Sequence, residues 1–195
     1  MNSPLVDLLG IRYIITPSPL LPEQITKSNL VQAAVFPGTY IYENTSALPR
    51  FWLVHHVKVA ANLPEALSVI RGNFNPACEA VAESEAIDLP QPVHHLSQPD
   101  EGVRVLEYRR GEIHLRIHTA TQSFLASSEA YYPGWKAIVD GKKTPIRITN
   151  AAFMGVTVPP GTYEVTFLFR PPIVPASATI SGIFAVMLAA ISMTM

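Results

Sequence analysis

The stretch "EIHLRIHT", residues 112–119, decides the fold, because apolar and polar side chains alternate along its whole length. Successive side chains of a β-strand point to opposite faces, so this period of two predicts a strand with one buried face. The stretch "TYEVTFLFR", residues 162–170, repeats the pattern with Tyr, Val and Phe on one face. Both stretches therefore predict strands that bury one face in a core.

Pairs of residues that contain glycine separate these stretches at short intervals. Arg110-Gly111, Asp140-Gly141 and Pro160-Gly161 each supply a residue that tolerates a positive φ in a tight turn. Short strands at this spacing, with few helical segments, indicate an antiparallel β-sandwich. We therefore predict a mainly β fold with minor α (α+β), with the sandwich over residues 101–172.

Residues 1–100 have a more mixed pattern, which predicts an α/β N-terminal part of the same domain. Strands are expected at 13–16, 39–43 and 51–60, the last because it is rich in β-branched and aromatic residues. A short helix is expected over "NLPEALSVIRG", residues 62–72, with Asn as its N-cap and Gly as its C-terminal stop.

Charge and cysteine content argue against two classes of site. The net charge is −1 and the basic residues form no stripe that could neutralise a row of phosphates, so no nucleic-acid partner is expected. Cys78 is the only cysteine, so neither an intrachain disulfide nor a cysteine-based metal site is expected.

The C-terminal stretch "PPIVPASATISGIFAVMLAAISMTM", residues 171–195, contains no charged residue. A helix over residues 173–195 would be about 34 Å long, enough to cross a hydrocarbon core of about 30 Å. Small residues recur along one side of it, which lets another membrane helix approach closely. The alternative is a buried core helix of a soluble protein, although such helices rarely lack charge over this length. We expect a truncated transmembrane helix, with the lipid bilayer as a partner.

The N-terminal stretch "MNSPLVDLLGIRYIIT" raises a question of topology. It lacks a basic region, and Asp7 and Arg12 interrupt its apolar run, so no signal peptide is expected. The region before the expected span is then either cytoplasmic and tail-anchored, or preceded by further spans in a longer parent protein. Composition leaves both alternatives open.

The stretch "EAYYPGWKAIVDGKKTPI", residues 129–146, combines aromatic residues with a Pro-Gly break and an Asp-Gly turn. One interpretation is an exposed aromatic platform that stacks on a sugar. The favoured one is a core strand and a hairpin, because alternate residues face opposite sides of a sheet and the rings are therefore separated. The residues assigned to this structural or glycan-contacting signature are Tyr131, Tyr132, Pro133, Gly134, Trp135, Asp140 and Gly141.

No constellation of side chains in the sequence predicts catalysis, a metal ion or a cofactor. On strands, His55 and His56 would face opposite sides, and His114 and His118 would lie about 13 Å apart, so neither pair is expected to share a zinc ion. The histidines are expected to be exposed, and the glutamates between residues 79 and 85 to be solvated. The sequence has no Gly-x-Ser-x-Gly elbow, phosphate-binding loop or dinucleotide-binding glycine motif.

Four stretches of the chain resemble the C-terminal part of the YfhO family of bacterial multi-spanning membrane proteins. They are "PLVDLLGIRYIIT" (4–16), "YIYENTSALPRFWLV" (40–54), "YYPGWKAIVDGKKTPI" (131–146) and "NAAFMGVTVPPGTYEVTFLFRPP" (150–172). The Tyr-Pro-Gly-Trp run followed by Asp-Gly-Lys is the most specific element of the resemblance.

The resemblance implies an extracytoplasmic domain followed by a closing span, in a parent that looks like a membrane glycosyltransferase. Such proteins use polyprenyl-phosphate-linked sugars and are implicated in decorating cell-envelope polymers. The implied partners are the bilayer, upstream transmembrane helices of the parent and an envelope glycopolymer. The superfamily's catalytic carboxylate lies in an early loop that this chain does not contain, so the chain alone is expected to be non-catalytic and to hold no cofactor.

One segment departs from the family pattern. The resemblance leads us to expect a basic residue after the Phe of this segment, as in Phe-Arg-Ala-Val, but this chain has Phe153-Met154-Gly155-Val156. A contact of that basic residue with a phosphate or an acidic polymer would be lost here.

Two rival functions stay open: a glycan-binding β-sandwich module that uses the aromatic signature, and a tail-anchored structural or interaction domain that faces the cytoplasm.

Overall fold

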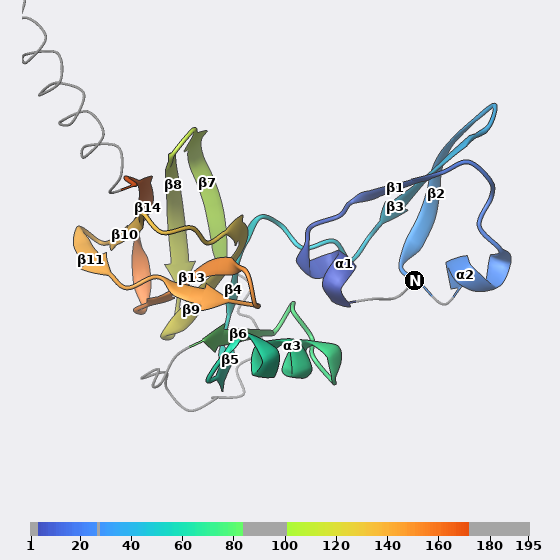
Figure 1. Cartoon of the computed structure of the whole chain (residues 1–195). Helices are drawn as coiled ribbons and strands as arrows, with labels where there is room; N and C mark the ends of the chain where they lie inside the picture. Colours follow the sequence, from blue (N-terminus) through green and yellow to red (C-terminus); the bar gives the residue numbers. More distant parts are fainter. Residues whose placement is uncertain (1–3, 27, 84–100, 172–195) are drawn as a thin grey trace, which may run out of the picture.

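The computed structural model describes residues 4–26, 28–83 and 101–171 of the 195-residue chain. Within these ranges the chain forms fourteen β-strands and three short helices, which confirms the expected mainly β fold. The strands form three sheets, of which the smallest lies on one side and the two larger ones lie together on the other (Figure 1). We call these parts the N-terminal lobe and the two-sheet body.

The N-terminal lobe contains one antiparallel sheet of three strands. Its strands lie in the order β1 (Tyr13–Thr16), β3 (Thr39–Asn44), β2 (Leu30–Phe36), and its helices are α1 (Pro4–Leu8) and α2 (Pro22–Thr26). Strand β2 was not predicted, because most of its side chains are exposed and its register with β3 shifts. The lobe contacts the body through Leu8, which is 2% exposed and belongs to the same buried cluster as Trp52.

The five-stranded sheet of the body is antiparallel throughout and has the order β11-β10-β14-β8-β7. Its strands are β7 (Gly102–Arg109), β8 (Glu112–Thr119), β10 (Trp135–Val139), β11 (Lys142–Thr144) and β14 (Gly161–Phe169). The alternation of apolar and polar residues over 112–119 predicts one buried face for β8. Ile113, Leu115 and Ile117 are indeed at most 1% exposed, so this prediction is confirmed.

The six-stranded sheet of the body has the order β4-β9-β13-β12-β6-β5. Its strands are β4 (Phe51–Val54), β5 (His56–Ala60), β6 (Glu79–Glu83), β9 (Ser123–Ala130), β12 (Arg147–Thr149) and β13 (Phe153–Val158). Residues 51–60 do not form the single strand that was expected, because the chain breaks at His55. Strand β4 pairs with β9 at one edge of the sheet, whereas β5 pairs in parallel with β6 at the other.

The parallel pair β5–β6 is connected by helix α3 (Leu63–Arg71), as parallel strands require a crossover. The Oδ1 atom of Asn62 accepts a hydrogen bond from the Glu65 N–H at 3.1 Å, and a carboxylate oxygen of Glu65 accepts one from the Ala61 N–H. These contacts satisfy two free donors at the start of the helix. The predicted helix and its N-cap are confirmed.

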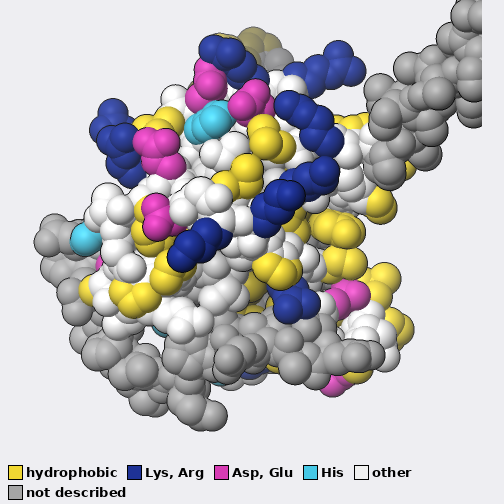
Figure 2. Space-filling model, turned by 90° about the vertical axis from the view of Figure 1, so that its left-hand side faces the viewer, with side chains coloured by type: hydrophobic (Ala, Val, Ile, Leu, Met, Phe, Trp, Pro, Cys, Tyr) yellow, Lys and Arg dark blue, Asp and Glu magenta, His cyan; other side chains and the backbone are white. Residues whose placement is uncertain are grey.

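The inner faces of the two larger sheets share one core. Buried side chains from β8, β10 and β14 pack with buried side chains from β4, β9 and β13. The largest of them include Phe51 and Phe167, whose ring centroids lie 6.2 Å apart across the two sheets. The side of the body away from the N-terminal lobe carries a row of Lys and Arg side chains (Figure 2), so the expectation that the basic residues form no stripe is wrong for this face.

The transmembrane helix expected at residues 173–195 lies outside the described residues. Within the described ranges, no helix is long and apolar enough to cross a membrane. The boundary between an N-terminal and a C-terminal part at residue 100 stays a prediction. The six-stranded sheet takes strands from both sides of that boundary.

Candidate functional site

The aromatic signature of residues 131–135 lies against the end of β14. Trp135 pairs with Phe169 in the register of β10 and β14, and their ring centroids are 5.2 Å apart. The ring of Tyr132 meets the same Phe169 edge-on, with centroids 6.2 Å apart. Phe169 is therefore the ring on which the other two pack.

Gly134 allows this packing because its backbone touches the chain that follows β14. Its φ is 117°, and a Cβ atom placed there would lie 2.8 Å from the Cα of Pro171. Its carbonyl accepts a hydrogen bond from the Arg170 N–H at 2.8 Å. A residue with a side chain would collide with this backbone and would adopt φ > 0 only with strain, so the Pro-Gly break is a structural requirement.

The two tyrosines of the signature point to different sides. Tyr131 is partly buried and packs against the core that the two sheets share. Tyr132 is 64% exposed, and Pro133 beside it is also exposed. The structure therefore brings Tyr132 and Trp135 together over Phe169 and separates them from Tyr131, so the signature does not present three rings on one flat surface.

Asp140 and Gly141 form the tip of the hairpin between β10 and β11. Both have positive φ, 49° and 73°, as a two-residue type I′ turn requires. Asp140 is exposed at this tip, and it contributes to the environment of Tyr163. Burial of Tyr163, together with the negative charge of Asp140, raises the pKa of the Tyr163 hydroxyl to about 12.

The segment that departs from the family pattern belongs to the core. Met154 is fully buried, and a Cβ atom on Gly155 would lie 2.3 Å from the ring of Phe124. A charged side chain buried at position 154 would lose its hydration without a partner, which is strongly unfavourable. Position 154 of this chain therefore offers no cation to a ligand.

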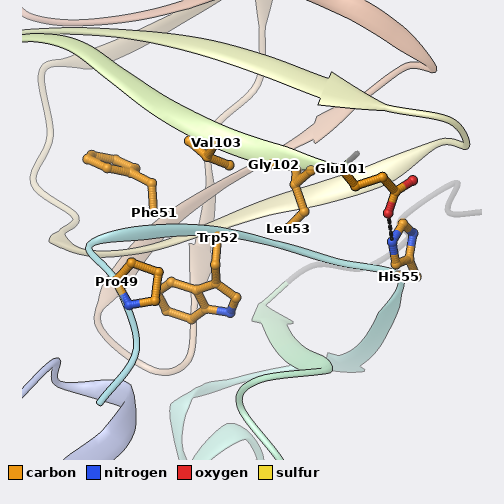
Figure 3. A pocket seen from close by; sticks show the side chains of 8 residues that line it. All are labelled: Pro49, Phe51, Trp52, Leu53, His55, Glu101, Gly102 and Val103. Atoms are coloured by element: carbon orange, nitrogen blue, oxygen red, sulfur yellow. Dashed lines mark hydrogen bonds and ion pairs between the residues drawn. The ribbon is translucent and has the colours of Figure 1, made fainter. Parts of the chain in front are cut away.

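A pocket that the sequence did not reveal lies between β4 and the start of β7, the edge strands of the two larger sheets (Figure 3). Its volume is about 250 Å³. The residues that line it are Pro49, Phe51, Trp52, Leu53, His55, Glu101, Gly102 and Val103. One end is therefore aromatic and apolar, and the other end is formed by an imidazole and a carboxylate.

The polar end of the pocket is a contact between an imidazole and a carboxylate within a hydrogen-bond network. His55 Nε2 lies 2.9 Å from Glu101 Oε2, as drawn in Figure 3, and Glu101 Oε1 accepts a hydrogen bond from the Ala120 N–H at 2.9 Å. The Glu101 side chain is only 7% exposed. Burial by itself raises the pKa of Glu101, but the hydrogen bonds from Ala120 and His55 outweigh burial, and the net pKa is lowered. The carboxylate is therefore ionised at neutral pH.

The other nitrogen of His55 faces a serine. His55 Nδ1 lies 3.2 Å from Ser123 Oγ, so hydroxyl, imidazole and carboxylate lie in sequence, as in a nucleophilic triad. However, Ser123 is 2% exposed, and its hydroxyl also contacts the carbonyl of Thr121 at 3.0 Å and the hydroxyl of Thr119. A buried hydroxyl that is already hydrogen-bonded is poorly accessible to a substrate, so we interpret the network as structural.

A second cluster joins strands β7 and β9 to Arg50, the residue before β4, through side chains far apart in the sequence. Arg50 Nη1 lies 2.6 Å from Glu129 Oε1, and the Tyr108 hydroxyl donates to the same carboxylate oxygen at 2.9 Å. The guanidinium also lies over the Tyr108 ring, 5.2 Å from its centroid. The side-chain hydrogen bond with Glu129 raises the pKa of Arg50, so the guanidinium stays charged in the folded state.

Other histidines and glutamates of the described residues also have structural partners, although one buried carboxylate oxygen of Glu83 has none. His114 lies 2.8 Å from Glu112 on the outer face of β8, and Glu79 lies 2.6 Å from Lys58. The solvated segment expected around Glu79 is wrong, because β6 begins there and its three alanine and valine residues are fully buried. His55 is likewise not an exposed strand histidine. In the described part of the chain, no three His, Cys, Asp or Glu side chains are grouped closely enough to hold a metal ion.

Comparison with known protein families gives a match over just under half of the chain. Residues 86–181 match the family model described as bacterial membrane protein YfhO. This range includes two of the four stretches that carry the resemblance, 131–146 and 150–172, whereas 4–16 and 40–54 lie before it. No curated protein and no solved structure matches the chain.

Proposed function

Because residues 86–181 match the family model of the bacterial membrane protein YfhO, we propose that this chain contributes the extracytoplasmic domain of such a protein. In this proposal the two larger sheets act as a non-catalytic β-sandwich. The domain supports the glycosylation of an envelope polymer by a membrane-embedded part that uses a polyprenyl-phosphate-linked sugar. The family match is the observation that supports the membrane-protein part of the proposal.

The geometry of the body is consistent with a supporting role. The polar groups of the pocket are engaged with one another. Two hydroxyls lie beside His55 Nδ1: that of Ser123, at 3.2 Å, is buried, and that of Thr121 is farther away, at 3.4 Å. The chain leaves β14 at Phe169 and continues into residues 171–195, which carry no charge. A rigid body joined directly to an apolar segment suits a domain held close to a bilayer and to upstream helices of its parent.

The proposal is tested in a bacterial strain from which the gene of the full-length protein has been deleted. Envelope polymers are isolated and their sugars are quantified by mass spectrometry. We expect the deletion to remove one sugar and the wild-type protein to restore it. An unchanged sugar content in the deletion strain would refute the proposed role.

The non-catalytic part of the proposal has its own test in two buried serines of β9. Ser123→Ala removes the hydroxyl beside His55, and Ser127→Ala removes a hydroxyl that only contacts backbone, including the Met154 carbonyl at 2.7 Å. We expect both variants to restore the sugar to the same extent once protein abundance is matched. Loss of activity in Ser123→Ala alone would instead identify a catalytic serine.

The rival glycan-binding module is distinguished by the exposed ring of Tyr132. Under that hypothesis Tyr132→Ala abolishes binding of envelope oligosaccharides while the fold is kept, and Tyr13→Ala, at another exposed tyrosine, does not. Under our proposal the wild-type domain by itself shows no such binding, as measured by calorimetry with the isolated oligosaccharides.

A further inference from the structure

Three chain segments meet at one end of the five-stranded sheet, where the described chain ends after β14 (Figure 1). The Phe169 N–H donates to the Gly111 carbonyl at 2.8 Å, and the Arg170 N–H donates to the Gly134 carbonyl at 2.8 Å. The β7–β8 turn, the start of β10 and the end of β14 are therefore neighbours. We call this surface, formed by residues 110–111, 132–136 and 169–171, the exit end.

The exit end exposes an aromatic surface. Tyr132 is 64% exposed, and it packs edge-on against Phe169, which also contacts Trp135. Trp135 and Phe169 are themselves only partly buried. The Tyr132 hydroxyl has no hydrogen-bond partner among the residues that the structure describes, so this ring has an apolar body on the protein and a polar tip in the surroundings.

The same end has an excess of positive charge. Arg110, Lys136 and Arg170 are exposed there, and none of them forms an ion pair with a described residue. The nearby carboxylates of Glu107 and Glu112 are each paired, with Arg109 and His114 respectively. Three cations are therefore left to interact with groups outside the described residues.

These features lie next to the uncharged segment. Ile173 follows Pro171 by two residues, so its Cα lies at most about 7 Å along the chain from that of Pro171. The headgroup layer on each side of a bilayer is only about 5–8 Å thick. A span that begins at Ile173 would thus hold the exit end at the level of the lipid headgroups.

From this geometry we propose that the exit end is a membrane-interface anchor: Tyr132 and Trp135 insert into the headgroup layer, and Arg110, Lys136 and Arg170 contact lipid phosphates. Tyrosine and tryptophan are enriched at this depth because one end of each ring system is apolar and the other is polar. Exposed cations near a membrane surface are attracted by acidic lipids. The inference rests on the proposed function, because it requires that residues 173–195 enter the bilayer.

The anchor fits the observed geometry better than a sugar platform. The rings of Trp135 and Phe169 are tilted by 48° and those of Tyr132 and Phe169 by 61°, so neither Trp135 nor Tyr132 forms a flat surface with Phe169 for a pyranose. A disordered headgroup layer needs no flat surface. It requires an aromatic residue with a polar tip and flanking cations, and the exit end supplies both.

The test uses the full chain in vesicles of phosphatidylcholine and phosphatidylglycerol, with one fluorescent probe at a time. Because Cys78 is the only cysteine and is exposed, Cys78→Ser allows a unique probe at Tyr132→Cys. Tyr13→Cys in the same background is the matched control, since Tyr13 is also an exposed tyrosine, 53% accessible, but lies in the N-terminal lobe. Flotation of the vesicles measures binding of the chain. Iodide quenches the fluorescence of a probe that is exposed to water, and spin-labelled lipid headgroups quench a probe that lies at the membrane surface.

We expect the probe at position 132 to be quenched several-fold less by iodide, and several-fold more by labelled headgroups, than the probe at position 13. Lys136→Glu combined with Arg170→Glu should reduce this difference in vesicles with acidic lipid. If the chain floats with the vesicles but both probes are equally accessible to iodide, the anchor is refuted and the proposed function survives. If the chain does not float, both are refuted.

Discussion

The N-terminal sheet and the five-stranded sheet are both antiparallel and both rich in β-branched and aromatic residues, yet these residues are buried to different extents in the two sheets. In the N-terminal sheet, Ile15 is 66% exposed and Phe36 is 57% exposed. In the five-stranded sheet, Ile113 is 1% exposed and Phe167 is fully buried. The difference arises because a second sheet covers the inner face of the five-stranded sheet, and no described element covers Ile15 and Phe36.

The comparison teaches that apolar residues in a strand do not by themselves predict a core. Burial of apolar surface stabilises a fold by about 25 cal/mol per Å², so a strand contributes in proportion to what packs on it. We therefore expect the stability of this chain to be concentrated in the two-sheet body. The predictions that follow test this contrast, and each is measured by guanidinium unfolding of the full chain in mild detergent.

The largest effect is expected for Phe167→Ala. Removing a fully buried ring leaves a cavity in the shared core, and we expect a loss of about 3–5 kcal/mol in the free energy of unfolding. Phe36→Ala in the lobe is the matched control and should change it by less than about 0.5 kcal/mol. Equal losses in the two variants would break the contrast between body and lobe.

The second effect concerns close packing within the body. In Gly155→Ala the new Cβ would lie 2.3 Å from the Phe124 ring and 2.5 Å from Thr149 Oγ1, so both neighbours must move. We expect a loss of about 3 kcal/mol, as for other overpacked cores. Gly102→Ala meets no atom within 4 Å and should leave stability unchanged. A stable Gly155→Ala variant would show that the core is looser than the structure indicates.

The third effect concerns carboxylates, one in the two-sheet body and one in the N-terminal lobe. Glu101→Gln replaces the buried carboxylate of the pocket, and we expect a loss of about 1.5 kcal/mol at neutral pH. Because the pKa of Glu101 is lowered on folding, its contribution is present above the unfolded-state value of about 4.3 and is lost as the pH falls through the lower folded value.

The stability difference between wild type and Glu101→Gln should therefore shrink on acidification. Glu43→Gln removes the partly exposed partner of the exposed Arg12 in the lobe and should have little effect, since solvent screens this pair. If the loss of unfolding free energy in Glu101→Gln stays constant down to acidic pH, the residue contributes through its shape and not through its charge.

The smallest effect is expected for Ile15→Thr on the outer face of β1. Its side chain is two-thirds exposed, and threonine keeps the β-branched shape, so the change should be below about 0.5 kcal/mol. A loss of several kcal/mol would reveal that this face is covered when the full chain is folded.

Sequence reasoning succeeded where a local signal sets the structure. The alternation of residues 112–119 predicted the buried face of β8, the Asp140-Gly141 pair predicted a hairpin, and Asn62 predicted the start of α3. It failed where the structure depends on contacts between segments that are distant in the sequence. Nothing near His55 signals that the chain breaks there, because the break depends on β4 and β5 pairing at opposite edges of the same sheet.

The candidate sites divide in the same way. The period of two already separates Tyr131 from Tyr132, and the structure places these rings on different sides. The pocket was missed because Glu101 and His55 are 46 positions apart, and no local pattern joins them. The contact of Gly134 with Pro171 was likewise hidden, although an unexplained glycine between a proline and a tryptophan was the available signal.

Labelling of Cys78 with a membrane-impermeant maleimide tests most directly the proposal that this body lies on the extracytoplasmic side of the membrane. Cys78 is exposed on the body and is the only cysteine of the chain, so the labelled peptide can be identified by mass spectrometry, with Cys78→Ser as the control. The account predicts labelling in intact spheroplasts, at the level reached after permeabilisation. Labelling that requires permeabilisation would place the domain in the cytoplasm and contradict the account.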